Sequence, residues 1–196
     1  MSHNLILATW TDSSKAFEAF SELKNSELSN IHQALVIQRQ SNANFEIKEQ
    51  LNNDYGSNTL GGGLAGSLLG ILGGPLGVLL GFSSGALIGS LFDDDQALSS
   101  DSVLTTISKK LPLESTALLI DLDEVDEKVA DKFFDSKQAI LLRWDYATVE
   151  AEVEASVEAW DEAQRIAQKT LSEQKKAEHK EKRQQKWEAF KAKFHK

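Results

Sequence analysis

The chain has 196 residues, no cysteine and a formal net charge of -9 at pH 7. This length predicts one domain, or one domain with an extension. The lack of cysteine excludes disulfides and thiolate metal sites and suits a reducing cytoplasm, and the negative charge argues against general nucleic-acid binding. Residues 1–10 lack the basic start and the long apolar run of a signal peptide, so we expect any membrane entry to use an internal segment.

The first quarter of the chain predicts a strand, a helix and a strand hairpin. Residues 3–10 (HNLILATW) are rich in strand formers and end at polar residues that can cap a helix. Residues 31–40 and 44–51 are predicted to form the second strand and its hairpin partner. Between them, residues 15–25 have the helical period, with one apolar face made of Ala16, Phe17, Ala19, Phe20 and Leu23.

Residues 55–92 form a run of 38 residues without Asp, Glu, Lys, Arg or His, and this run holds all twelve glycines of the chain. Each exposed helical glycine costs about 1 kcal/mol relative to alanine, so close contact with another helix must compensate. Four-residue spacing is typical of such packing in lipid. We therefore predict a glycine zipper that forms an oligomer or membrane interface through Gly62, Gly66, Gly70 and Gly74, and through Gly73, Gly77, Gly81, Gly85 and Gly89.

Pro75 follows two glycines in the middle of this run and predicts a break between two helical arms, 60–73 and 75–92. The arms would be ~20 and ~27 Å long, shorter than the ~30 Å core of a bilayer. The alternatives are a thin or tilted pair, a re-entrant hairpin, one kinked helix, or a hairpin buried inside a soluble oligomer. An uncharged run of more than ~18 residues favours membrane insertion.

The region after the zipper predicts a helix over 96–111, a strand over 116–122, a helix over 125–134 and a strand over 138–144. The second helix has an apolar side made of Val125, Val129, Ala130, Phe133 and Phe134. Without the insertion, the order is close to β-α-β-β-α-β. The predicted fold class is α+β: a ferredoxin-like split βαβ sandwich formed by 1–54 and 93–144, with the zipper hairpin 55–92 inserted.

This combination of a small α/β sandwich, the insertion GGGLAGSLLGILGGPLG and the acidic residues Asp93 to Asp95 resembles a bacterial glycine-zipper family of unknown function, often labelled predicted membrane protein. The resemblance spans about residues 3–144, and it implies no substrate, cofactor or catalytic residue. The segment 44–51 and the tail after Trp144 depart from the shorter members. We expect the bacterial inner (cytoplasmic) membrane, with the soluble domain on the cytoplasmic side; the alternative location is the cytoplasm.

The tail, residues 145–196, contains no Gly or Pro and predicts one long helix or two collinear helices. Residues 145–162 carry seven acids and no base, whereas 163–196 carry eleven bases and four acids. A seam at steps of three and four predicts a docked face: Val149, Val153, Val157, Trp160, Ala163, Ala167 and Leu171. The end resembles a basic interfacial helix that contacts lipid or another subunit, with Trp187, Phe190, Phe194, Lys186, Lys191 and Lys193; a solvated, frayed tail is the alternative.

No residue pattern indicates catalysis. The glycines of 61–66 fit G-x-G-x-x-G, but they follow turn-like residues and no acid lies about 20 residues further on, so we reject a dinucleotide site. Asp93 to Asp95 lack the alternating ligands of a cation loop, and the acids of 121–127 suit helix capping. The four histidines, His3, His32, His179 and His195, have no acid or Cys at ligand spacing, so we predict no metal, cofactor or catalytic residue.

The leading functional hypothesis is a non-enzymatic, homo-oligomeric, membrane-associated protein. Its zipper hairpins would pack into a pore, a scaffold or a membrane-remodelling complex, and its basic tail would contact anionic lipid or a neighbouring subunit. The alternative is a soluble homo-oligomer, such as a stress or shell-like protein, with the zippers buried inside. Apart from lipid and other copies of the chain, we expect no nucleic acid and no small-molecule substrate as a partner.

Overall fold

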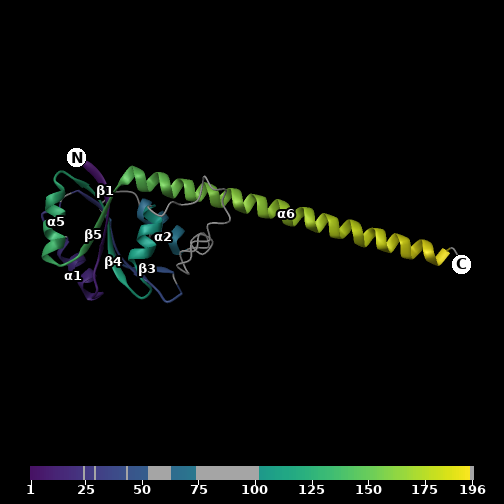
Figure 1. The fold of residues 1–196 in the computed structure, drawn as a ribbon, viewed down its shortest axis with the longest axis horizontal. Helices are drawn as coiled ribbons and strands as arrows, with labels where there is room; N and C mark the ends of the chain where they lie inside the picture. Colours follow the sequence, from purple (N-terminus) through teal and green to yellow (C-terminus); the bar gives the residue numbers. More distant parts are fainter. Residues whose placement is uncertain (24, 29, 43, 53–62, 74–101, 195–196) are drawn as a thin grey trace. The chain divides into compact units, whose positions relative to one another are not determined.

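The computed structural model describes residues 1–23, 25–28, 30–42, 44–52, 63–73 and 102–194, with the backbone alone for 189–194. They form a mixed α+β structure with a five-stranded antiparallel sheet and a long C-terminal helix (Figure 1). The predicted fold class is confirmed at this level. The elements are β1 Ser2–Thr9, α1 Ser14–Leu23, β2 Ile31–Arg39, β3 Phe45–Asn52, α2 Gly63–Gly73, α4 Val103–Lys110, β4 Thr116–Glu124, α5 Glu127–Ser136, β5 Ile140–Asp145 and α6 Tyr146–Phe194.

The sheet has the order β3-β2-β4-β1-β5, and every pair of neighbouring strands is antiparallel. β4 lies between β1 and β2, and Ile120 pairs with Ile6 on one side and with Ala34 on the other. Every residue of β4 except Asp123 is buried, as expected for a central strand covered on both faces. β3 lies at one edge and is only half-buried.

Alternating residues of the central strands point to two separate layers of apolar side chains. Ile6, Ile120 and Leu122 face α1 and α5 and form a core with Phe20 and Phe134. The odd-numbered residues of β1, Leu5 and Leu7, point to the opposite face and are fully buried. On that face α2 contacts β3, β4 and α4. Figure 1 shows α1 and α5 on one side of the sheet and α2 on the other.

Two predicted helix faces need correction. Val125 is 77% exposed because it precedes α5, which begins at Glu127 after Asp126 caps it by accepting a hydrogen bond from the backbone N–H of Lys128. Phe17 is 37% exposed, on the edge of the α1 face whose other predicted members are buried. Val129, within α5, is 36% exposed, so in both helices the apolar face is narrower than the spacing predicted.

The helix predicted over 60–73 is observed as α2 in the part that lies in the described residues, 63–73. Its aliphatic side chains are buried, and its glycines lie elsewhere on the helix: Gly66 is half-buried and Gly70 is exposed. The second arm, 75–92, and the acidic residues 93–95 lie outside the described residues. Among the helices in the described part of the chain, none is both long enough and apolar enough to cross a membrane.

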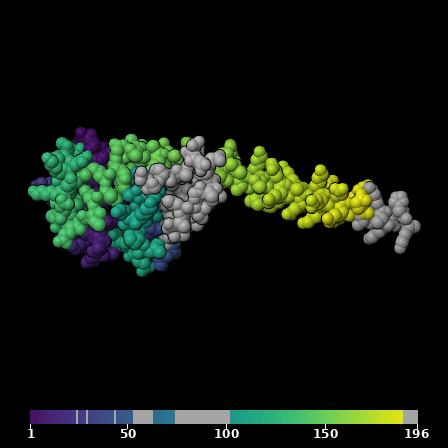
Figure 2. Space-filling view, viewed as in Figure 1, coloured from purple at the N-terminus to yellow at the C-terminus, as the bar shows by residue number. Residues whose placement is uncertain are grey.

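The long tail helix is confirmed as α6, and the chain divides into two compact units, 1–156 and 157–196. Val149 and Val153 are buried in the first unit, so this part of the predicted seam does dock. Beyond Ser156 the predicted seam is only partly covered: Val157 and Leu171 are 42% and 56% exposed, whereas Trp160 and Ala163 are half-buried. Within the second unit, α6 is a single helix whose described side chains are exposed except for the half-buried Ala159, Trp160 and Ala163, and Figure 2 shows one face of it.

Candidate functional site

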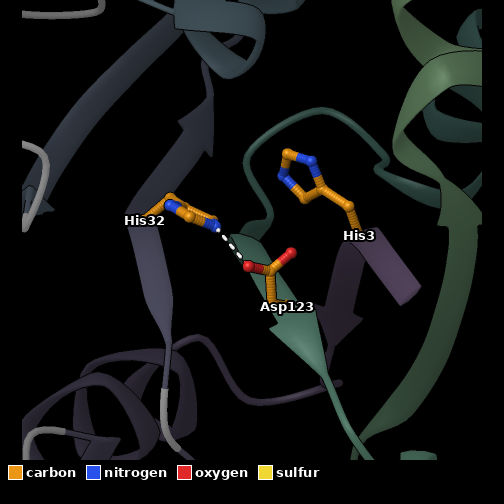
Figure 3. A group of neighbouring side chains, drawn as sticks. All are labelled: His3, His32 and Asp123. Carbon is orange, nitrogen blue, oxygen red and sulfur yellow. Dashed lines mark ion pairs between the residues drawn. The ribbon is translucent and has the colours of Figure 1, made fainter. Parts of the chain in front are cut away.

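Two histidines and an aspartate from three neighbouring strands meet on the face of the sheet opposite α1 and α5. His3 of β1 pairs with Asp123 of β4 in the strand register. The register of β2 against β4 shifts between Ile31 and Gln33, so His32 is the extra residue of a bulge, a device that re-aims a side chain. Figure 3 shows the His32 ring turned towards Asp123, with the His3 ring beside them.

Short contacts join these side chains to one another and to Asp121. Nε2 of His32 lies 3.2 Å from a carboxylate oxygen of Asp123, and Nε2 of His3 lies 2.6 Å from Oδ1 of Asp121. The two imidazole rings are 5.0 Å apart between centroids. The His3 ring also stacks on Tyr146 at 3.8 Å and 12°, so the first residue of α6 borders the site.

This cluster has the chemistry of a cation site. His3, His32 and Asp123 each offer one ligand atom, and the three atoms lie within 4.8 Å of one another. All three residues are half-buried, which permits entry from solvent while limiting the competition from bulk water. Imidazole nitrogen and carboxylate oxygen are ligands of zinc and other divalent transition metals.

Sequence spacing could not reveal this cluster, because its members come from residues 3, 32 and 123. The acids of 121–127 were expected to cap a helix. Asp126 does so, but Asp121 and Asp123 contact histidines instead. The available signal was the pattern of β4: two aspartates at alternate positions of an otherwise apolar strand share one face.

The predicted interface glycines divide into a described and an undescribed group. A Cβ built on Gly70 would meet no heavy atom of the described structure within 4 Å, so this position is open. A Cβ on Gly73 would lie 3.0 Å from the backbone nitrogen of Phe45, so glycine permits the close approach of β3. Gly66 is half-buried on the same helix. The remaining predicted positions lie outside the described residues: Gly62, Gly74, Gly77, Gly81, Gly85 and Gly89.

The predicted basic and aromatic end lies within α6. Lys186 is exposed and Trp187 is 57% exposed. The other four predicted positions belong to α6 by their backbone: Phe190, Lys191, Lys193 and Phe194. A shared aromatic side on this part of the helix therefore remains a prediction.

A buried polar network lies on the α1/α5 face of the same end of the sheet. Glu124 is 4% exposed and accepts hydrogen bonds from Asn4 at 2.7 Å and from Arg143 at 2.7 and 3.1 Å. Asp131 accepts another from Arg143 at 2.7 Å. Burial opposes the charge of Arg143, but the hydrogen bonds to Glu124 and Asp131 outweigh it and raise the arginine pKa. The network joins β1, β4, β5 and α5 and so fixes the sheet beneath the histidine cluster.

No protein-family model, no curated protein and no solved structure matches this chain. The resemblance to the glycine-zipper family therefore remains a prediction. The candidate sites depend on the geometry of the described residues alone.

Proposed function

We propose that this chain is a non-enzymatic protein whose copies assemble into a homo-oligomer through the glycine-bearing side of α2. The carrying observation is the division of this helix into two sides. Its buried side chains, Leu68 at 0% exposure among them, pack within the chain's own α/β unit, whereas Gly70 has no neighbour within 4 Å of an added Cβ among the described residues. A helix interior with several glycines is intrinsically weak, so it gains stability when another helix covers them.

The occupant of this surface in our proposal is α2 of a second copy. A two-fold interface brings the same patch of two subunits together, and a glycine ridge suits that symmetry because it is self-complementary in shape. Missing side chains let two helix backbones approach closely, which increases van der Waals contact along the ridge. Gly66 and Gly70 are the described positions of this ridge.

Association with a membrane is the second part of the proposal. Its support is the uncharged sequence of 55–92 together with the basic end of the tail, which suits anionic lipid at the cytoplasmic side of a bacterial inner membrane. One observation favours the alternative, a soluble oligomer with buried zippers in the cytoplasm. The leucines of the described arm are buried within its own α/β unit, so these side chains do not contact lipid.

We infer that the α/β unit is a ferredoxin-like sandwich with one added strand. With the edge strand β3 set aside, the order β2-β4-β1-β5 places β4 between β1 and β2, and α1 and α5 provide the crossovers of a split βαβ. In this interpretation 55–92 is an insertion between β3 and α4. Such a unit is a scaffold for assembly in our proposal, with no small-molecule substrate and no nucleic acid as partner.

The deciding experiment compares Gly70→Leu with Ser21→Leu by measuring particle mass in detergent and in plain buffer. Both changes add leucine to an exposed helical position, but Ser21 lies on α1, on the opposite face of the sheet. We expect Gly70→Leu to lower the particle mass while the far-ultraviolet circular dichroism of the α/β unit is retained, and Ser21→Leu to leave the mass unchanged. An unchanged mass for Gly70→Leu in both solvents would contradict assembly through α2. Oligomers of native mass in plain buffer would favour the soluble alternative.

A further inference from the structure

We propose that His3, His32 and Asp123 bind one divalent transition-metal ion of the zinc class. Two imidazoles and one carboxylate form a three-ligand set that leaves a coordination position for water. The ligands come from β1, β2 and β4, the three central strands of the sheet, and the bulge in β2 directs His32 towards the other two. This site is independent of the proposed assembly through α2.

The spacing of the ligand atoms suits a small metal ion. Zinc binds nitrogen and oxygen ligands at roughly 2.0–2.1 Å, so two ligands of a tetrahedral site lie about 3.3 Å apart. The distance of 3.2 Å between Nε2 of His32 and Oδ2 of Asp123 already has this value. Because all three ligand atoms lie within 4.8 Å of one another, a side-chain adjustment of His3 of roughly an ångström completes the set.

The surroundings of the cluster favour a cation. Asp121 is 8% exposed and adds a second carboxylate beside the site. A divalent ion bound by the two uncharged imidazoles would therefore lie near two negative charges. Asp121 contacts Nε2 of His3 at 2.6 Å and so helps to fix the orientation of this ring. Tyr146 stacks on the same ring and limits its rotation. These contacts keep the His3 ring beside the other two ligands, so only a small adjustment is needed when an ion binds.

The test is the binding of Zn²⁺ to the full-length, tag-free chain, measured by competition with a chromophoric chelator. We expect one ion per chain, and at least a tenfold loss of affinity in His32→Gln and in Asp123→Asn. The control is His179→Gln, because His179 is an exposed histidine of α6 far from this cluster in the chain. Its affinity should match that of the native chain. Co²⁺ in place of Zn²⁺ should give the visible absorption of a tetrahedral nitrogen–oxygen site.

A measurement on the native chain covers the case in which a variant does not fold. Histidine ring signals, followed by NMR as one equivalent of Zn²⁺ is added, should shift for His3 and His32 and stay in place for His179. The proposal is overturned if only the tail histidines respond. It is equally overturned if the folded variants His32→Gln and Asp123→Asn bind Zn²⁺ as tightly as the native chain.

Discussion

Glu152, in the second turn of the docked part of α6, accepts a hydrogen bond of 2.8 Å from the backbone N–H of Val103, the first residue of α4. Its other carboxylate oxygen accepts one of 2.9 Å from the N–H of Leu104. At the opposite end of α4, Nη1 of Arg39 donates to the carbonyls of Ser108 and Leu111 at 2.8 and 2.7 Å. A negative charge at the helix start and a positive charge at its end both complement the helix dipole, so α4 is fixed from β2 and from α6.

Replacing Glu152 with alanine should destabilise the α/β unit by about 1–3 kcal/mol, because the first N–H groups of α4 lose a charged acceptor. Glu152→Gln should lose less, since its amide oxygen can still accept one hydrogen bond. The measurement is the free energy of unfolding in urea. Glu154→Ala, an exposed position on the same helix, is the control and should change the free energy by less than about 0.5 kcal/mol. Equal effects at both positions would contradict a specific role for Glu152.

Arg39→Met should cost about 1.5–3 kcal/mol or more, because two carbonyls at the end of α4 lose a charged donor in a position that is 5% exposed. Burial lowers the pKa of Arg39, yet an arginine stays protonated at pH 7. Arg39→Lys should recover part of this loss, since both carbonyls accept from the single nitrogen Nη1 and an ammonium group also carries several donors. Urea unfolding gives the ranking, and full recovery by lysine would show that only the charge matters.

Two alanine substitutions in α2 should have opposite signs. Gly70→Ala should raise the stability of the dissociated subunit by up to about 1 kcal/mol, because the new methyl group meets no atom of the described residues and alanine favours the helix. Gly73→Ala should lower it by roughly 1 kcal/mol, because the methyl group would press on the backbone of Phe45. Thermal unfolding at low protein concentration checks both. Equal shifts in the unfolding temperature of the two variants would contradict the close contact between Gly73 of α2 and Phe45 of β3.

Asp12 should contribute an acid-sensitive part of the stability. Its carboxylate accepts a backbone hydrogen bond of 2.9 Å from Ser14 and another from the Ser14 hydroxyl, which lowers its pKa below the ordinary 3.8. A lowered pKa in the folded state stabilises the protein above pH 3.8 and loses this effect as the pH falls further. Asp12→Asn should therefore narrow the difference in unfolding free energy between pH 7 and about pH 2.5. The same pH dependence in both proteins would exclude Asp12 as a source.

The basic end of α6 should bind anionic vesicles. We expect the full-length chain to co-sediment with them, with a contribution of about 1 kcal/mol per Lys or Arg near the surface that weakens with salt. The comparison is a chain truncated after Gln174, which lacks residues 175–196. This shorter chain should lose the binding while its α/β unit stays folded. Equal binding of both chains to neutral and anionic vesicles would remove lipid as the partner of the tail.

The elements themselves followed from local sequence. Runs of strand-forming residues placed the strands, the lack of Gly and Pro in 145–196 predicted α6, and the apolar run from 60 onwards predicted a helix where α2 lies. These signals lie within a few residues of one another, because backbone hydrogen bonds of a helix and the side-chain alternation of a strand repeat over two to four residues. The structure corrected two predicted apolar faces, because Phe17 and Val125 are exposed.

Only the tertiary structure decided which distant groups meet. His3 and Asp121 lie 118 residues apart and come into contact because β1 pairs with β4, and His32 joins them because a bulge shifts the register of β2 by one residue. Likewise, Glu152 meets α4 because the start of α6 docks through Val149 and Val153. Such contacts depend on strand order and on the docking of helices, which no local period encodes. The side-chain period of a strand is two, so one inserted residue changes which face carries a histidine.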